Sequence, residues 1–332
     1  MDSLLTINQL GIEFESRTKK NEKVKILQDI DLSINEGEII ALVGESGCGK
    51  TTLGKAIVGL YPPTHGTISY KGKDITKLSK KEYSDFRLGV QMVHQDSFAA
   101  LNPNRTIFQS LSLPLLQNKI AKNKKEAEEI LREYFGEVGL TPAEQFLYKY
   151  PHQLSGGQRQ RILLARALSV KPKIIVADEP VSMVDVSLRI ALIDLMTRMN
   201  QKYKISFVYI THDLATARYV AKDGRLAVMY LGKIVELNNI RQAIDNPVHP
   251  YFKALIAAVP SHVGRGKSEM KDLPLRSLDM PSVNNPPSGC SFHTRCPYYD
   301  TRCEKESPVL REYEKGGMVA CHFAEKIAEE MK

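Results

Sequence analysis

The feature of this sequence that most constrains its fold is a glycine-rich stretch at residues 44–52. It reads Gly44, Glu45, Ser46, Gly47, Cys48, Gly49, Lys50, Thr51 and Thr52. An apolar run typical of a buried strand precedes it at residues 39–43, and residues 53–60 favour a helix. A strand, a glycine-rich turn and a helix in this order indicate that the pattern Gly-x4-Gly-Lys-Thr is a phosphate-binding loop.

The residue types of this phosphate loop suit a nucleoside triphosphate. Its glycines let the backbone curl so that successive N–H groups point at an anion. The N-terminus of the following helix adds a partial positive charge at the same place. In this pattern we expect Lys50 to reach the β- and γ-phosphates and the Thr51 hydroxyl to ligate Mg²⁺.

The later part of the chain alternates between apolar runs and segments of helical character. Short strands are predicted at 90–95, 173–177 and 206–210, and helices at 186–202 and 214–222. Such alternation is typical of an α/β fold with a largely parallel sheet.

Two other regions depart from this alternation. Residues 3–15 and 24–34 alternate apolar and polar side chains, which predicts antiparallel strands with one solvated face. Residues 99–151 favour helices, with apolar positions at helical spacing in 123–140, and form a helical insertion in the α/β core.

Polar side chains follow the predicted strands where each strand ends. They are Thr51, Gln95, Asp178, Glu179 and His212. Ligands of open parallel sheets lie beyond the carboxyl ends of the strands. We therefore expect these five side chains to converge on one nucleotide.

Composition excludes some classes of protein. The 332 residues carry a net charge of +8, but no stripe of Arg and Lys is interleaved with aromatic residues, so a nucleic-acid partner is not supported. No apolar stretch approaches the ~20 residues that span a bilayer. The N-terminus has neither a basic region nor an apolar core, so no signal peptide is expected.

A second motif narrows the class of nucleotide-binding protein. Residues 154–158 read Leu-Ser-Gly-Gly-Gln, well after Lys50 and shortly before the strand that ends in Asp178 and Glu179. With this motif set the whole chain resembles the nucleotide-binding subunit of ATP-binding cassette (ABC) transporters. That resemblance implies a P-loop NTPase with a RecA-like parallel-sheet core, an antiparallel β subdomain and a helical insertion.

The resemblance also implies a role for each motif residue. Residues 44–52 match the Walker A loop, and Gln95 matches the glutamine that touches Mg²⁺ or the attacking water. Asp178 matches the Walker B aspartate, which holds the Mg²⁺ shell. Glu179 would polarise the attacking water as the general base, and His212 would act at the γ-phosphate.

The family shares its ATP sites between two chains. The signature segment, residues 154–158, opens a helix predicted at 159–169, so its N–H groups and the Ser155 hydroxyl are expected to form an anion site together with Gly156, Gly157 and Gln158. In the family this site faces ATP on a second ABC ATPase subunit, here a homologous chain or a second copy. Residues 182–185 match the D-loop of the family, which ends in Asp185.

One family feature has no counterpart at its usual place. The family stacks an aromatic side chain on adenine from the loop before the second strand, and residues 16–25 contain none. Phe14, or a side chain from elsewhere, is the expected substitute.

The C-terminal third resembles one subfamily. Residues 246–251 and 289–297 are similar to the extension of oligopeptide/dipeptide importer ATPases. The resemblance divides the chain into a nucleotide-binding domain at 1–245, with a helical subdomain at about 97–165, and an extension at 246–332. Residues 260–289 indicate a linker or an extended wrap.

Four cysteines gather in this extension. Cys290, Cys296, Cys303 and Cys321 have the spacing C-x5-C-x6-C-x17-C. Four thiolates suit a [4Fe–4S] cluster or a tetrahedral Zn²⁺ ion. The family resemblance favours the cluster as a structural clip, and zinc or unliganded reduced thiols are the alternatives.

The sequence therefore predicts the ATPase subunit of an ABC importer at the cytoplasmic face of the cell membrane. Hydrolysis would power uptake of oligopeptides or dipeptides through two separate permease subunits, served indirectly by a solute-binding protein. Oligosaccharides and nickel are alternative cargoes. A soluble ABC ATPase acting on nucleic acid or the ribosome is disfavoured by the single cassette, and an inactive binding module by Lys50, Glu179 and His212.

Overall fold

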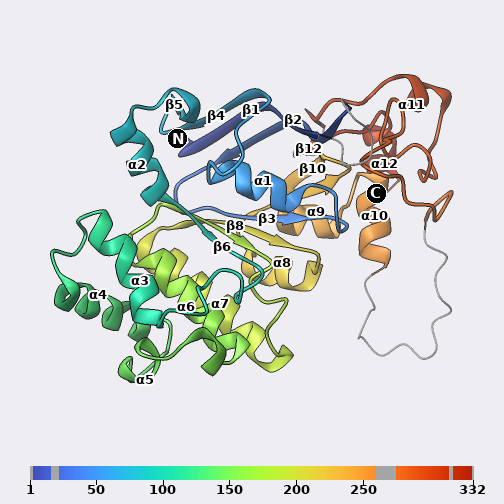
Figure 1. Cartoon of the computed structure of the whole chain (residues 1–332). Helices are drawn as coiled ribbons and strands as arrows, with labels where there is room; N and C mark the ends of the chain where they lie inside the picture. Colours follow the sequence, from blue (N-terminus) through green and yellow to red (C-terminus); the bar gives the residue numbers. More distant parts are fainter. Residues whose placement is uncertain (1–2, 16–21, 259–273, 314–316, 331–332) are drawn as a thin grey trace.

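An eight-stranded β-sheet forms the centre of the molecule, and a four-stranded sheet packs against one of its faces (Figure 1). The structure is a computed structural model that describes residues 3–15, 22–258, 274–313 and 317–330. Across the large sheet the strands are β11 (Arg311–Glu312), β12 (Met318–Val319), β10 (Lys233–Asn239), β9 (Arg225–Tyr230), β3 (Ile39–Val43), β8 (Ser206–Thr211), β7 (Ile174–Asp178) and β6 (Val90–Val93).

The strands from β9 to β6 are parallel to one another, as the alternating pattern predicts. β3, β7 and β8 are buried along their whole length because both faces of the sheet are covered. In β3, Ile40 and Leu42 face one hydrophobic core, and Ala41 and Val43 face the other. Continuous apolar runs in the sequence are typical of strands that are buried on both faces.

The small sheet confirms the predicted antiparallel strands. Its order is β2 (Lys23–Ile34), β1 (Leu5–Glu15), β4 (His65–Tyr70) and β5 (Lys73–Asp74). Its apolar face packs with the first helix against Ile40 and Leu42 of β3. The phosphate loop therefore leaves a strand that is fixed from both sides.

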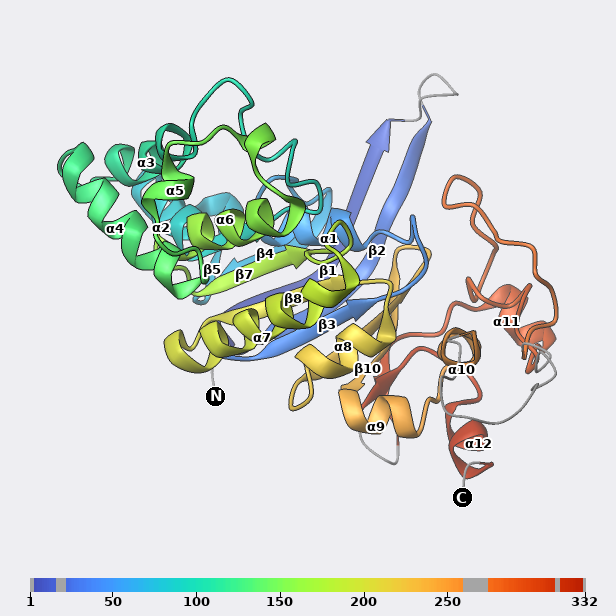
Figure 2. The same ribbon diagram turned by 90° about the horizontal axis from the view of Figure 1, so that it is seen from below.

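Helices cover the large sheet and form the predicted insertion. The α-helices are α1 (Lys50–Ile57), α2 (Lys80–Gly89), α3 (Ile107–Gln117), α4 (Lys124–Glu137), α5 (Glu144–Leu147), α6 (Gly156–Leu168), α7 (Val186–Tyr203), α8 (Leu214–Val220), α9 (Ile240–Asp245), α10 (Pro250–Ala257), α11 (Thr301–Lys305) and α12 (Ala324–Glu329), with 3₁₀ turns η1 (Ile75–Lys77) and η2 (Pro151–Gln153). Helices α3–α5 lie at the end of the molecule opposite α10–α12 (Figure 2).

Several boundaries differ from the prediction. α1 begins at Lys50 rather than at 53, and α6 begins at Gly156 rather than at 159. Both first turns lack apolar periodicity, so the sequence pattern begins only after them. β6 ends at Val93, which leaves Gln95 in the following loop. Helix α2 was not predicted, although a Ser79–Glu82 capping box begins it.

The C-terminal extension adds to the large sheet. β12 pairs antiparallel with β10, with Glu236 opposite Val319. A small third core, which includes Val248, Cys321 and Ile327, lies beneath it. Residues 274–289 contain no helix and no named strand, as predicted for a wrap, and 259–273 lie outside the described residues. No helix in the described part of the chain has the length and apolar character needed to cross a membrane.

Candidate active site

The phosphate loop has the glycine conformations that its sequence implies. Gly44, Gly47 and Gly49 have φ angles of 153°, 79° and 106°. Residues other than glycine rarely adopt such positive values. A Cβ atom on Gly44 would also lie 2.2 Å from the carbonyl oxygen of Met229. The curl of the loop therefore depends on glycine for its dihedral angles and for its close approach to β9.

Lys50 and Thr51 occupy the first turn of α1, directly after the loop. The buried Lys50 ammonium donates hydrogen bonds to the carbonyl oxygens of Gly44, at 2.7 Å, and Glu45, at 2.9 Å. The Thr51 hydroxyl lies 3.2 Å from Oδ1 of Asp178 and donates to it. The loop, the lysine and the end of β7 therefore form one connected unit.

Glu179 lies at the centre of the cluster of strand ends. Its Oε1 lies 3.0 Å from Nδ1 of His212, and its Oε2 accepts a hydrogen bond from Nε2 of Gln95 at 2.8 Å. Gln95 and His212, two of the side chains expected to converge, thus both contact Glu179, and their meeting at one nucleotide stays a prediction. Their catalytic roles stay a prediction at this point.

The backbone at Glu179 is unusual. Its φ angle of 43° lies in the left-handed region, which non-glycine residues seldom occupy. Its N–H group donates to the carbonyl oxygen of Ile210 at 2.9 Å, which ties it to β8. Strain of this kind often accompanies functional positions, and here it turns the carboxylate toward Gln95 and His212.

The oxygen atoms near Asp178 fit a magnesium ion. Burial raises the pKa of the Asp178 carboxyl, and its hydrogen bond from Thr51 opposes that shift. Hydroxyl, carboxylate and amide oxygens are hard ligands of the kind that Mg²⁺ prefers, with water and substrate phosphates completing its shell. Thr51, Asp178 and Gln95 would therefore hold Mg²⁺ next to Glu179.

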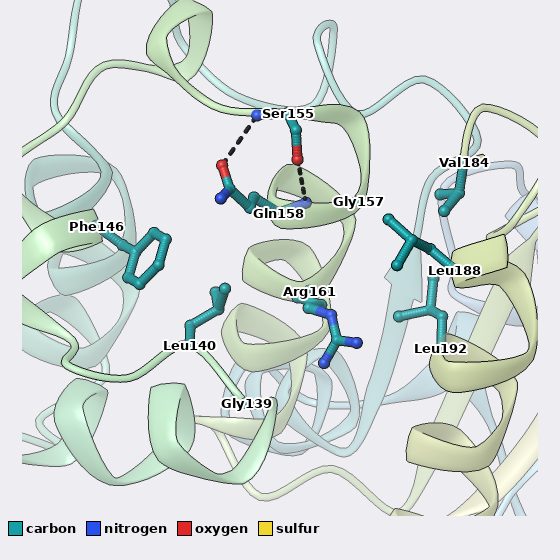
Figure 3. A pocket seen from close by; sticks show the side chains of 10 residues that line it. All are labelled: Gly139, Leu140, Phe146, Ser155, Gly157, Gln158, Arg161, Val184, Leu188 and Leu192. Atoms are coloured by element: carbon teal, nitrogen blue, oxygen red, sulfur yellow. Dashed lines mark hydrogen bonds between the residues drawn. The ribbon is translucent and has the colours of Figure 1, made fainter.

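The signature segment begins α6 with a reciprocal capping box. Oγ of Ser155 accepts from the Gln158 N–H at 3.2 Å, and Oε1 of Gln158 accepts from the Ser155 N–H at 3.0 Å (Figure 3). The first-turn N–H groups of Gly156 and Gly157 have no acceptor within the helix. The helix end thus retains outward donors of the kind that an anion site needs.

The signature segment lies close to the D-loop of the same chain. A Cβ atom on Gly156 would lie 2.8 Å from the carbonyl oxygen of Met183, so glycine permits this approach. Asp185, the N-cap residue of α7, is exposed and makes no side-chain capping bond. A cavity of about 310 Å³ beside this contact is lined by Ser155, Gln158 and apolar side chains that include Leu188 (Figure 3).

One buried arginine of this region, Arg159, was not predicted from the sequence. The Arg159 guanidinium lies 3.4 Å from the ring centroid of Phe98 and donates through Nε to the Ser97 hydroxyl at 3.3 Å. It thereby joins the signature helix to the loop that follows Gln95. Only its place next to the signature segment could have indicated it.

The residue that would stack on adenine is not identified by these contacts. Phe14 is 39% exposed and packs edge-on against Tyr61, with ring centroids 5.1 Å apart. Residues 16–21 of the loop in question lie outside the described residues. The substitution by Phe14 therefore stays a prediction.

The four extension cysteines are free thiols inside the fold. Cys296, Cys303 and Cys321 are buried and Cys290 is half-buried. Burial, reinforced by the neighbouring cysteines, raises the pKa of Cys296 and of Cys321 to about 12. Metal ligation requires thiolates rather than thiols.

The metal predictions for these cysteines are not supported by the geometry. Among the described residues, which include all four cysteines, no three His, Cys, Asp or Glu side chains are grouped so as to hold a metal ion. Neither a tetrahedral Zn²⁺ site nor the predicted [4Fe–4S] site is therefore assembled. The physical reason is that burial disfavours the charged thiolate at Cys296 and Cys321.

Comparison with known proteins identifies the family. Residues 27–182 match the family described as ABC transporter, and residues 235–303 match the one described as oligopeptide/dipeptide transporter, C-terminal region. The oligopeptide transport ATP-binding protein AppF of Bacillus subtilis (strain 168) is 41% identical over 306 residues, which are 92% of this chain and 91% of that protein. The di/tripeptide transport ATP-binding protein DppF of Pseudomonas aeruginosa (strain UCBPP-PA14) is 39% identical over 331 residues, 98% of this chain and 99% of that protein.

A solved structure agrees with the sequence relatives. It is the dimeric, post-hydrolysis state of the ATP-binding cassette MJ0796 bound to ADP and phosphate. It is 28% identical with a TM-score of 0.63, and the match covers 71% of this chain and 99% of that one. The chain therefore belongs to the ABC transporter ATPases, as an ATP-binding subunit of the oligopeptide/dipeptide transport type.

Proposed function

We propose that this ATPase powers the uptake of oligopeptides or dipeptides through two membrane permease subunits, from the cytoplasmic face of the cell membrane. The observation that carries the ATPase chemistry is the Glu179 carboxylate, held by Gln95 and His212 next to the Thr51–Asp178 pair. The proposed cargo follows from the names of relatives about 40% identical over nearly the whole chain, extension included.

Each site residue has a role in the proposed reaction. Lys50 and the loop N–H groups bind the β- and γ-phosphates, and Thr51 and Asp178 would hold Mg²⁺, which would supply positive charge at those phosphates. Glu179 accepts a proton from the attacking water as the general base. Gln95 and His212 hold the two oxygens of that carboxylate, so its orientation is set before the reaction.

A second ATPase subunit completes each site in this proposal. The signature segment offers the N–H groups of Gly156 and Gly157 at a helix end, which suits the phosphates of a nucleotide bound to a partner. The partner is a homologous chain or a second copy of this one. With that partner present, Mg-ATP and Glu179→Gln should drive dimers in a sedimentation experiment, and strictly monomeric profiles would count against the arrangement.

Transport assays test the cargo. Vesicles that contain the permeases and this chain, supplied with the solute-binding protein, should accumulate a labelled tripeptide when ATP is added on the side of the ATPase. Vesicles with the Lys50→Ala chain are the matched control and should not. Uptake of an oligosaccharide or of Ni²⁺ in place of the peptide would replace the proposed cargo by one of its alternatives.

We also propose that the four extension cysteines hold a [4Fe–4S] cluster when the protein is assembled with iron, with Zn²⁺ as the alternative. Their number supports this, as does the Phe323 N–H that donates to the sulfur of Cys321 at 3.4 Å. Protein purified without oxygen should be brown, with absorbance near ~400 nm. Cys296→Ser should lose this colour, Cys48→Ala in the phosphate loop should keep it, and colourless wild-type protein would refute the cluster.

A further inference from the structure

The extension touches the phosphate loop directly. Nη1 of Arg295 lies 3.2 Å from both carboxylate oxygens of Glu45, the second residue of the loop. The Arg295 side chain is 7% exposed and that of Glu45 is 25% exposed, so water screens the pair only in part. Two residues 250 positions apart in the sequence thus form an ion pair at the nucleotide site.

A second residue of the extension holds the same loop residue. Oη of Tyr251 accepts the N–H of Glu45 at 2.8 Å. Tyr251 is buried at the start of α10, and its own N–H donates to Nδ1 of the capping His249 at 3.1 Å. Its ring packs against Tyr230 and Phe292, with centroids 4.6 and 5.6 Å away. The hydroxyl is therefore fixed in place by packing around the ring.

These contacts reach Lys50 through Glu45. The carbonyl oxygen of Glu45 accepts the Lys50 ammonium at 2.9 Å, while its N–H and its carboxylate are bound to Tyr251 and Arg295. Every polar group of Glu45 is thus engaged. A loop held in this way loses little conformational freedom when it binds phosphate.

The charge of Glu45 gives Arg295 a second effect. A carboxylate within the phosphate loop repels a triphosphate, and at partly buried sites such repulsion is weakly screened. Arg295 neutralises that carboxylate. Removal of the Arg295 guanidinium would leave the Glu45 carboxylate as an unneutralised negative charge beside the nucleotide phosphates.

We propose that Arg295 and Tyr251 are positioning residues of the ATP site: the extension braces the phosphate loop at Glu45, and Arg295 cancels the charge of Glu45 toward the triphosphate. This brace rests on the proposed role of the loop in binding ATP. It gives the extension a part in nucleotide affinity, besides any part that its cysteines have.

The test is calorimetric titration of the full chain with a non-hydrolysable ATP analogue and Mg²⁺. Arg295→Met should raise the Kd by about tenfold, the range expected for a coupled charge pair. Glu45→Gln in the same chain should restore the Kd to within about threefold, because the unneutralised carboxylate is gone. Arg311→Met is the matched control, since Arg311 pairs with Glu325 on the exposed side of the extension. It should leave the Kd unchanged.

Two further measurements separate positioning from a general loss of fold. In the assembled importer, Arg295→Met should raise the KM for ATP and keep kcat at saturating ATP, whereas misfolding lowers kcat without rescue by Glu45→Gln. Tyr251→Phe retains the packed ring and loses only the acceptor for the Glu45 N–H. It should weaken binding by about threefold to tenfold at unchanged melting cooperativity, and it keeps the brace testable if Arg295→Met does not fold.

The outcomes distinguish failure of the proposed brace from failure of the proposed ATPase function. Failure of the unaltered chain to bind the analogue would overturn the proposed function and the brace together. Normal binding by the unaltered chain with an unchanged Kd in Arg295→Met or in Tyr251→Phe would overturn the brace alone. Weakened binding in Arg295→Met that Glu45→Gln does not restore would refute the charge effect.

Discussion

The nucleotide-binding core and the C-terminal extension are held together in different ways. In the core, β3, β7 and β8 are buried on both faces, so their stability is spread over many apolar contacts. The extension has short elements and depends on individual contacts, such as the Arg295–Glu45 pair. A single substitution in the extension can therefore act on a distant function, whereas one in the core acts first on the fold.

The largest expected effect concerns chemistry, which this comparison assigns to the core. Glu179→Gln retains the shape of the side chain, so the contacts with Gln95 and His212 can persist, but an amide cannot accept the proton of water. ATP turnover should fall by about 10²-fold or more while nucleotide binding is kept. Glu325→Gln, at a half-buried carboxylate of the extension that pairs with Arg311, is the control and should leave turnover unchanged.

Steady-state hydrolysis and analogue binding, measured on the same preparations, decide this prediction. Near-normal turnover in Glu179→Gln would remove Glu179 as the general base and leave His212 as the next candidate. A loss of turnover in Glu325→Gln as large as that in Glu179→Gln would break the separation of the two regions.

The next effect concerns stability. Leu42 is fully buried in β3, so Leu42→Ala should lower the free energy of unfolding by about 2–5 kcal/mol. Val309 in the extension is 73% exposed, and Val309→Ala should change it by less than about 0.5 kcal/mol. Urea unfolding followed by circular dichroism measures the free energy of unfolding of both variants. An equal loss in the two variants would contradict the difference in packing between the core and the extension.

The last effect concerns the junction of the two regions, where the buried Glu236 carboxylate accepts the N–H groups of Val248 and His249. Burial raises the pKa of Glu236 to about 8, from an unfolded value of 4.5. Between these values the folded chain binds more protons than the unfolded chain, so its stability should fall as the pH rises from about 4.5 to about 8. The slope contributed by this group is at most about 1.4 kcal/mol per pH unit.

Urea midpoints at pH 6 and pH 8 test this sign. Glu236→Gln cannot titrate, so its stability should change less between the two pH values than that of the unaltered chain. Glu325→Gln, which alters a carboxylate paired with Arg311, should retain the full change. An identical pH dependence in Glu236→Gln and the unaltered chain would show that this carboxyl group does not titrate in that range.

Much of the ATP site could be predicted from the sequence. Asp178, Glu179 and His212 lie at the ends of continuous apolar runs, Thr51 follows the phosphate loop that leaves β3, and parallel strands bring such ends to one edge of a sheet. Gln95 also joins them, although it lies two residues beyond the end of β6. Element boundaries were less accurate where the first turn of a helix consists of glycine and polar residues, as in α1 and α6.

The sequence by itself determined the α/β class, the parallel core and the placing of Glu179 and His212 at neighbouring strand ends, because these depend on local periodicity and on residues next to strands. Only the tertiary structure decided that Arg295 and Tyr251 meet Glu45, that Arg159 stacks on Phe98, and that β12 extends the large sheet. These contacts join segments far apart in the chain. They depend on how the surfaces of finished elements pack, and no local pattern of residues encodes that packing.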